Sequence, residues 1–329
     1  MTLWITEGDV VSLMHLGDAI SALEEGLKLE AAGEAANMVK THAVWGGRNT
    51  LHAIGATFEG AGFVGTKTWG HTSGGATPLL ILWDSGSGEL KAVIEAFALG
   101  QMRTGAMSGV ASRWLAAADA HDMAVIGTGK QALTQVAAVA AVRPLRRVRV
   151  HSPSLENRTA FARKLAAEGL GFEVEASPSV EAAVEGASVI TLVTRATEAF
   201  LDAGMIAPGA HVNAVGAITP EREEFSQGLF QRAAVVAVDN VAGAKNLSKE
   251  YKRYYDGGPG DWADVKPICQ VVAAAGGRPR GADLTLFKAM GMGISDLSLG
   301  IKIYASAVKG GVGREIPHPT RAKPRLHGD

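Results

Sequence analysis

The chain has 329 residues and a mass of 34.1 kDa, a length that suggests about two domains. Its 32 lysines and arginines nearly balance 33 aspartates and glutamates, which excludes a nucleic-acid-binding protein that relies on bulk positive charge. The single cysteine, Cys269, excludes an intrachain disulfide and suits a reducing compartment, so we expect a cytoplasmic protein. We expect neither a membrane span nor a secretory signal, because no run of roughly 18 apolar residues occurs and no basic segment precedes an apolar one at the start.

The first third of the chain predicts a helix followed by a sheet. Apolar residues recur at helical spacing over 18–32, and Gly33 stands where a helix commonly ends. Between 40 and 90, short apolar or alternating runs are separated by glycine-rich turns, a pattern typical of an antiparallel or mixed sheet. A second helix is predicted over about 96–118, a stretch that contains no proline.

From Met123 onward, strand-like and helical segments alternate. The strand-like runs are MAVIG, VRVHS, SVITLVT, HVNAVG and VVAVD, and the helical segments between the first of them are 130–142, 157–168 and 180–184. This alternation predicts a parallel sheet covered by helices on both faces, and therefore a doubly wound α/β domain of the Rossmann type. We predict a further helix over 283–308 and a loose tail after it.

The segment AVIGTGKQALTQV carries a dinucleotide-binding pattern, G-x-G-x-x-A, between a predicted strand and a predicted helix. The first glycine permits the tight turn, the second lets the backbone approach a pyrophosphate, and the alanine keeps the helix close to the sheet. The helix N-terminus then stabilises the phosphate charge. We therefore predict cofactor contacts from Gly127, Gly129, Lys130, Gln131 and Ala132.

The end of the second strand of this unit bears on which dinucleotide binds. NAD sites carry an acidic residue there, but this chain has VRVHSPSLENR, in which Ser152 and Ser154 can donate hydrogen bonds and Arg158 can meet a 2′-phosphate. We predict that NADP(H) is preferred and that NAD(H) is possible. Alternatively, the two serines form only a turn and Arg158 is a solvated helix residue.

Four further segments carry a resemblance to a known family. They are GFVGTK, SGELKAVIEAFALGQMRTGAMSGVASRWLA, HVNAVGAITPEREEF and LTLFKAMGMGISD, where Ala289 occupies a place that the family fills with serine. Together with GTGKQA they are collinear from about residue 10 to 310, and the chain resembles the ornithine cyclodeaminase/mu-crystallin family. This resemblance implies NAD(P)(H)-dependent hydride chemistry at an amino or imino carbon beside a carboxylate.

The resemblance also implies an organisation for the chain. Residues 1–115 together with 296–329 would form an α+β domain that binds substrate and makes a homodimer, and 116–295 would form the Rossmann domain. The expected partner is a small imino or amino acid, with no nucleic acid and no membrane. No metal is expected, because none of the nine histidines stands at metal-ligand spacing from other potential ligands.

Lys67 and Arg103 match the catalytic and substrate-binding residues of the family. A lysine on an apolar strand is costly to bury without a partner, and an arginine can grip a carboxylate with two hydrogen bonds. A strand-edge solvated lysine and a structural ion pair are the alternatives. Lys40 stands where many relatives have a carboxylate-binding arginine, and Trp69 could line the same pocket or pack at its rim.

The remaining cofactor contacts follow from the resemblance and from position. Thr104 stands at the predicted start of the Arg-Thr helix, where its hydroxyl could reach a cofactor phosphate or cap the helix. The other residues expected at the cofactor are Val193, Thr194, Val215, Gly216, Ala217 and Gly291.

One departure from the family pattern affects the predicted reaction. Cyclodeaminating relatives carry an acid/base aspartate where this chain has Ile218, which cannot transfer a proton. The segment resembles ketimine-reducing members instead, so we predict a reductase of the C=N bond of an α-imino acid or cyclic ketimine carboxylate. The alternatives are an amino-acid dehydrogenase or ornithine cyclodeaminase-type deaminase, and a non-catalytic NADP(H)-binding protein. Glu221, Glu223 and Glu224 follow Pro220 and are expected to form a solvated helix start.

Overall fold

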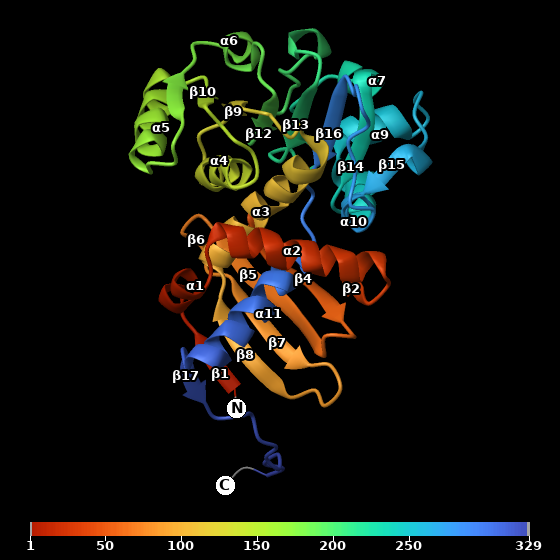
Figure 1. Cartoon of the computed structure of the whole chain (residues 1–329). Coiled ribbons are helices and arrows are strands. Elements are labelled where there is room, and N and C mark those ends of the chain that lie inside the picture. Colours follow the sequence, from red (N-terminus) through yellow and green to blue (C-terminus); the bar gives the residue numbers. More distant parts are fainter. Residues whose placement is uncertain (1, 328–329) are drawn as a thin grey trace.

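The computed structural model describes residues 2–327, which form two sheets joined by helices (Figure 1). Over these residues the first sheet has the strand order β17-β1-β8-β7-β5-β4-β2, with β3 paired to β4 and β6 paired to β5. Its strands are β1 (Thr2–Ile5), β2 (Ala35–Asn37), β3 (Thr41–Trp45), β4 (Asn49–Phe58), β5 (Phe63–Thr72), β6 (Gly75–Ala76), β7 (Leu79–Asp84), β8 (Leu90–Glu95) and β17 (Arg314–Ile316). The central pairs β4–β5, β5–β7 and β7–β8 are antiparallel, as predicted.

Two long helices cover one face of this sheet (Figure 1). These are α2 (Leu16–Ala31) and α11 (Gly293–Gly310), and the short helix α1 (Glu7–Leu13) lies beside them. Leu23 and Leu27 of α2 are fully buried against the same core as Leu80 and Leu82 of β7, which gives the hydrophobic reason for the packing. The predicted end of α2 is confirmed, since Gly33 takes a left-handed φ of 77° just after it.

The second sheet has the order β11-β10-β9-β12-β13-β16-β14-β15, and its strand pairs are parallel. Its strands are β9 (Asp122–Ile126), β10 (Arg147–His151), β11 (Glu173–Ala176), β12 (Val189–Leu192), β13 (Ala210–Ala214), β14 (Ala233–Val238), β15 (Val265–Pro267) and β16 (Leu284–Lys288). The order reverses at β9, with β10 on one side and β12 on the other. The predicted α/β fold with a doubly wound parallel sheet is confirmed, and the switch point at β9 is where such folds bind ligands.

Helices and short 3₁₀ segments connect the strands of this second sheet. They are α4 (Ala132–Ala140), α5 (Leu155–Ala167), α6 (Val180–Val184), η1 (Ala203–Met205), α7 (Gly228–Arg232), α8 (Val241–Leu247), α9 (Lys249–Tyr255), η2 (Trp262–Asp264) and α10 (Ile268–Ala273). Among the helices of residues 2–327, none combines the length and apolar character that crossing a membrane requires.

The prediction of a continuous helix over 283–308 is wrong in its first part. Leu284–Lys288 is strand β16, which lies between β13 and β14 with all five residues buried, and the helix α11 starts only at Gly293. A short apolar run has the same appearance at a helix start and in a buried parallel strand, so periodicity does not distinguish the two.

Helix α3 (Phe97–Leu115) runs between the two sheets (Figure 1). It begins at Phe97 because the Glu7 carboxylate accepts hydrogen bonds from the backbone N–H groups of Phe97, at 2.5 Å, and Ala98, at 2.9 Å. At the other end of the helix, Ser112 accepts a hydrogen bond from Asn213 Nδ2 of β13 at 2.9 Å. The helix therefore carries its residues to the boundary between the two sheets.

Candidate active site

Three charged side chains from three elements meet where the first sheet faces α3 and α11. Lys67 of β5 places its Nζ 2.5 Å from Oδ1 of Asp296 in α11, and Nε of Arg103 in α3 lies 3.2 Å from the same oxygen. Lys67 is 4% exposed and Asp296 is fully buried. The structure thus brings together the two predicted catalytic residues and adds a carboxylate that the sequence did not single out.

Close backbone packing places Asp296 at this point. A Cβ atom on Gly293, the first residue of α11, would lie 1.8 Å from the carbonyl oxygen of Gly55 in β4, so only glycine allows the helix to begin there. Asp296 lies in the first turn of α11, where the helix dipole favours a negative charge. Asp296 was not predicted as a site residue, because it stands in the mainly apolar segment GISDLSLG. An acidic residue within an apolar helix was the one signal that could have identified it.

The electrostatics of this cluster favour binding of an anion. Burial is the main cause that lowers the pKa of Lys67 to about 8; the nearby charges of Arg103 and Lys40 act in the same direction, and Asp296 opposes the change. Lys40 keeps contact with solvent, but the protein around it removes enough water to lower its pKa, with Arg103 acting in the same direction. Below the pKa of Lys67, three cations share one carboxylate, and the surplus positive charge suits a substrate carboxylate.

A row of aromatic rings extends from Lys67 along the same face of the sheet. Lys67 Nζ lies 5.3 Å from the ring centroid of Trp69, which stacks on His52 at 4.8 Å, and His52 stacks on His42 at 5.7 Å. These residues face the same side because Trp69 is paired with His52 and His52 with His42 across strands β5, β4 and β3. Burial, followed by the nearby charge of Lys40, lowers the pKa of His52. The row places three stacked rings beside the cationic cluster.

The glycine-rich loop after β9 has the geometry that a dinucleotide needs. Gly127 takes a φ of 113°, and a Cβ atom there would lie 2.6 Å from the carbonyl oxygen of Val193. A Cβ atom on Gly129 would meet nothing within 4 Å, so the backbone there is open to a ligand. Ala132 is fully buried at the start of α4, with exposed Lys130 and partly exposed Gln131 before it. These residues fit a pyrophosphate at the helix N-terminus.

The end of β10 carries no carboxylate. Ser154 caps α5 by accepting a hydrogen bond from the backbone N–H of Asn157 at 3.2 Å. Arg158 folds back over the turn, and its Nη1 donates to the carbonyl oxygens of Ser152 at 3.1 Å and Pro153 at 3.4 Å. The guanidinium is therefore held beside the strand end, next to Ser152 and Ser154.

Thr104 differs from its predicted setting. It lies inside α3, seven residues after Phe97, and its hydroxyl donates a hydrogen bond to the carbonyl oxygen of Gly100 at 2.8 Å. The helix predicted over about 96–118 is confirmed as α3, but the prediction that Arg103 and Thr104 stand at its start is wrong, because the Glu7 carboxylate caps the helix at Phe97, a full turn and more before them. Thr104 therefore does not cap the helix, although its carbonyl oxygen accepts a hydrogen bond from Gln135 of α4 at 3.1 Å.

The loops after β12 and β13 are tied together by Glu224. One carboxylate oxygen of Glu224 accepts from the backbone N–H and the hydroxyl of Thr194, and the other accepts from the N–H groups of Gly216 and Ala217. Five of the predicted cofactor residues stand in these two loops. Val193 and Thr194 follow β12, and Val215, Gly216 and Ala217 follow β13.

The expectation of a solvated helix start after Pro220 is wrong. Glu223 is 4% exposed and Glu224 is fully buried, the residues from Thr219 to Glu224 are not helical, and only Glu221 of the three is exposed. Glu223 and Glu224 are buried because each carboxylate has partners, which are basic side chains for Glu223 and backbone N–H groups for Glu224.

The loop between β16 and α11 lies against Arg103. Gly291 has a φ of 85°, and a Cβ atom there would lie 3.2 Å from Nη1 of Arg103. Asp239, at the end of β14, holds this loop by accepting from the N–H groups of Met290 at 2.7 Å and Gly291 at 2.8 Å. Burial raises the pKa of Asp239, and its backbone hydrogen bonds and Arg103 oppose the change. Within residues 2–327, no three acidic, cysteine or histidine side chains gather as a metal site.

The doubly wound second sheet has an open glycine loop, and it lies next to the first sheet, which carries the buried Lys67. This combination defines an NAD(P)-binding protein of the Rossmann type. More particularly, the chain belongs to the ornithine cyclodeaminase/mu-crystallin family, whose sequence model matches residues 2–311. It is 30% identical over 241 residues to a delta(1)-pyrroline-2-carboxylate reductase of Bacillus cereus, covering 72% of this chain and 73% of that protein. The family resemblance seen in the sequence is confirmed.

Two solved structures have the same fold over nearly the whole chain. The delta(1)-pyrroline-2-carboxylate reductase of Thermococcus litoralis, in complex with NADH and L-proline, has a TM-score of 0.88 at 26% identity, covering 95% of this chain and 100% of that one. An archaeal alanine dehydrogenase dimer with bound NAD has a TM-score of 0.87 at 27% identity, covering 96% and 99%. Both structures hold a nicotinamide dinucleotide.

Proposed function

We propose that the protein is an NAD(P)H-dependent reductase of the C=N bond in an α-imino acid or a cyclic ketimine carboxylate. The observation that carries this proposal is the buried cluster of Lys67, Asp296 and Arg103 beside a dinucleotide-binding fold. The likeness to a pyrroline-2-carboxylate reductase supports the same chemistry. The dinucleotide, when bound, supplies the hydride that the imine carbon receives.

The three cations have separate tasks in this reaction. Arg103 meets Asp296 through Nε, an arrangement that leaves its Nη groups to grip the substrate carboxylate in a directional way. Lys40 adds a point charge at the open side of the site. Lys67 has a pKa of about 8, which suits it to hold the carboxylate and to release a proton from Nζ to the nitrogen of the substrate near neutral pH.

Cofactor preference is the second part of the proposal. NADP(H) is preferred because β10 ends without a carboxylate and Arg158 is held at the strand end, where a 2′-phosphate would lie. NAD(H) is the alternative, because the two similar structures are described with NADH and NAD.

The chain is also proposed to act as a cytoplasmic homodimer, with residues 1–115 and 296–329 forming the substrate and dimerisation domain and 116–295 the Rossmann domain. Strand β3 supports the dimer, because it lies at the sheet edge and every residue in it is exposed, including Val44 and Trp45. Exposed apolar residues on an edge strand are commonly covered by a partner. Light scattering after size exclusion should give about twice the chain mass.

The alternative function is an amino-acid dehydrogenase or cyclodeaminase, favoured by the likeness to alanine dehydrogenase over 96% of the chain. A panel assay separates the candidates. The purified protein is given NADPH or NADH with cyclic ketimine carboxylates or with pyruvate and ammonia, and in the reverse direction NAD(P)⁺ with alanine, proline or ornithine.

The proposal expects the fastest turnover with a ketimine carboxylate. Faster oxidation of alanine, or conversion of ornithine to proline, would favour the alternative. Dinucleotide binding without turnover in either direction would leave only a non-catalytic NADP(H)-binding protein.

A further inference from the structure

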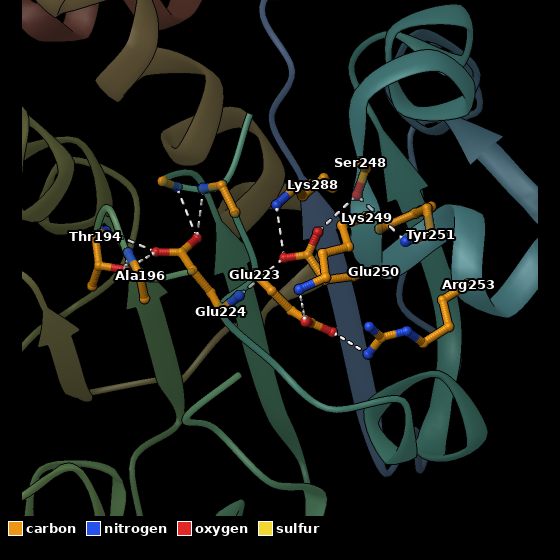
Figure 2. A network of polar contacts seen from close by, with 12 residues as sticks. Thr194, Ala196, Glu223, Glu224, Ser248, Lys249, Glu250, Tyr251, Arg253 and Lys288 are labelled. Atoms are coloured by element: carbon orange, nitrogen blue, oxygen red, sulfur yellow. Dashed lines mark hydrogen bonds and ion pairs between the residues drawn. The ribbon is translucent and has the colours of Figure 1, made fainter. Parts of the chain in front are cut away.

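The Glu224 carboxylate is fully buried and accepts four hydrogen bonds from two separate loops (Figure 2). Oε1 lies 2.7 Å from the backbone nitrogen of Thr194 and 2.8 Å from its hydroxyl, and Oε2 lies 2.9 Å and 3.0 Å from the backbone nitrogens of Gly216 and Ala217. The first loop follows β12 and the second follows β13. A single side chain therefore fixes the distance between two neighbouring loops at the carboxyl edge of the sheet.

The backbone of Glu224 is anchored from behind by a second buried network. Its N–H donates to Oε1 of Glu250 at 3.1 Å, and Lys288 of β16 places Nζ 3.3 Å from the same oxygen (Figure 2). The Ser248 hydroxyl donates to Oε2 of Glu250 at 2.8 Å. Lys288 and Glu250 are both fully buried. Glu224 therefore has little freedom to follow the loops if they move, and it holds them in one place.

The orientation of the N–H groups also sets the direction of three carbonyl groups. In a planar trans peptide the C=O points opposite to the N–H of the next residue. Because the N–H of Thr194 points to Glu224, the C=O of Val193 points away from it, toward Gly127 of the dinucleotide loop. The same rule directs the carbonyls of Val215 and Gly216 away from Glu224.

We propose that Glu224 is a positioning residue for the nicotinamide end of the cofactor. It acts through the carbonyls of Val193, Val215 and Gly216, which are acceptors of the kind that the N–H₂ donors of a carboxamide need. The nicotinamide would then lie in one orientation above the substrate site, as hydride transfer requires. This inference rests on the proposed function, because it places the nicotinamide at the carboxyl ends of β12 and β13.

Glu224→Gln tests the role with almost no change in volume. The amide nitrogen of Gln is a donor, so one pair of loop donors loses its acceptor and faces another donor. The matched control is Glu223→Gln, which also removes a buried charge but leaves the loops alone, because Glu223 pairs with Lys249 and Arg253, each at 2.7 Å.

The readout compares binding of the whole cofactor with binding of a fragment that lacks nicotinamide. Titration calorimetry gives the Kd of NADPH and of 2′-phospho-ADP-ribose, or of NADH and ADP-ribose if NADH binds better, and no turnover is needed. For Glu224→Gln we expect the dinucleotide Kd to rise about tenfold, while the fragment Kd stays within about twofold. Glu223→Gln should leave both unchanged.

An equal loss for dinucleotide and fragment would overturn the proposal, and so would unchanged binding of both. If Glu224→Gln does not fold, Thr194→Val removes one of the four hydrogen bonds to Glu224, together with the one that the Ala196 N–H donates to the Thr194 hydroxyl, and should show the same selective loss at about threefold. If the wild-type protein does not reduce ketimines but Glu224→Gln still weakens binding of the dinucleotide and not of the fragment, the result would count against the proposed reaction alone. Wild-type protein that bound neither compound would overturn both.

Discussion

Replacement of Asp296 by asparagine should move the pH dependence of the enzyme. Asp296 is fully buried, its Oδ1 lies 2.5 Å from Nζ of Lys67 and 3.2 Å from Nε of Arg103, and it is the group that opposes the low pKa of Lys67. In the wild type, the pKa of about 8 predicts that kcat/KM falls as pH rises through about 8, because Lys67 then loses the charge that binds the carboxylate. Without Asp296, desolvation and the charges of Arg103 and Lys40 act on Lys67 unopposed.

The size of the effect follows from the geometry. Opposite unit charges with centres about 4 Å apart attract by about 4 kcal/mol at an effective dielectric constant of about 20. One pH unit corresponds to about 1.4 kcal/mol, so full loss of this attraction equals nearly 3 pH units. Water entering beside the new asparagine side chain would stabilise the Lys67 charge and so compensate for part of the lost attraction. We therefore expect the alkaline limb of kcat/KM to move down by about one to two pH units.

The assay is the pH profile of kcat/KM for ketimine reduction, measured on both proteins with the same substrate so that substrate ionisation cancels. Lys67→Arg is the control, because its guanidinium keeps its charge above pH 12 and the limb near pH 8 should disappear from any active protein. A limb that stays in place in Asp296→Asn, or moves to higher pH, would refute the assignment of Lys67 and its coupling to Asp296.

Three further predictions concern the cofactor, the carboxylate and the reaction. NADPH should have a higher kcat/KM than NADH, and a preference for NADH of about tenfold, or 1.4 kcal/mol, would contradict the role given to Arg158. Arg103→Lys should keep the fold, as judged by circular dichroism, but lower kcat/KM about 10²-fold because the two-pronged grip is lost; full activity would exclude it as the carboxylate clamp. Ornithine should give little proline by mass spectrometry, because Ile218 lacks the acid–base help that is worth about 10²–10⁴-fold; stoichiometric proline and ammonia would show that another group supplies it.

Local sequence patterns were sufficient to predict those elements whose signals lie within a few residues of one another. The alternation of apolar runs and helical segments after Met123 predicted the parallel sheet, and the glycines at 127 and 129 predicted an open loop after β9. In both cases the backbone requirement is local, since a tight turn needs glycine where it occurs. β16 was missed because a five-residue buried strand carries no periodicity of its own.

What the sequence by itself determined was the fold class, the dinucleotide loop and the presence of Lys67 and Arg103 as unusual charges. Only the tertiary structure decided which carboxylate pairs with these charges and which one ties the loops after β12 and β13 together. Asp296 reaches Lys67 across 229 residues of sequence, and Glu224 binds Thr194, 30 residues before it, and Gly216, 8 residues before it. A buried charge is stable only with partners, and those partners are chosen by how strands and helices pack rather than by their neighbours along the chain.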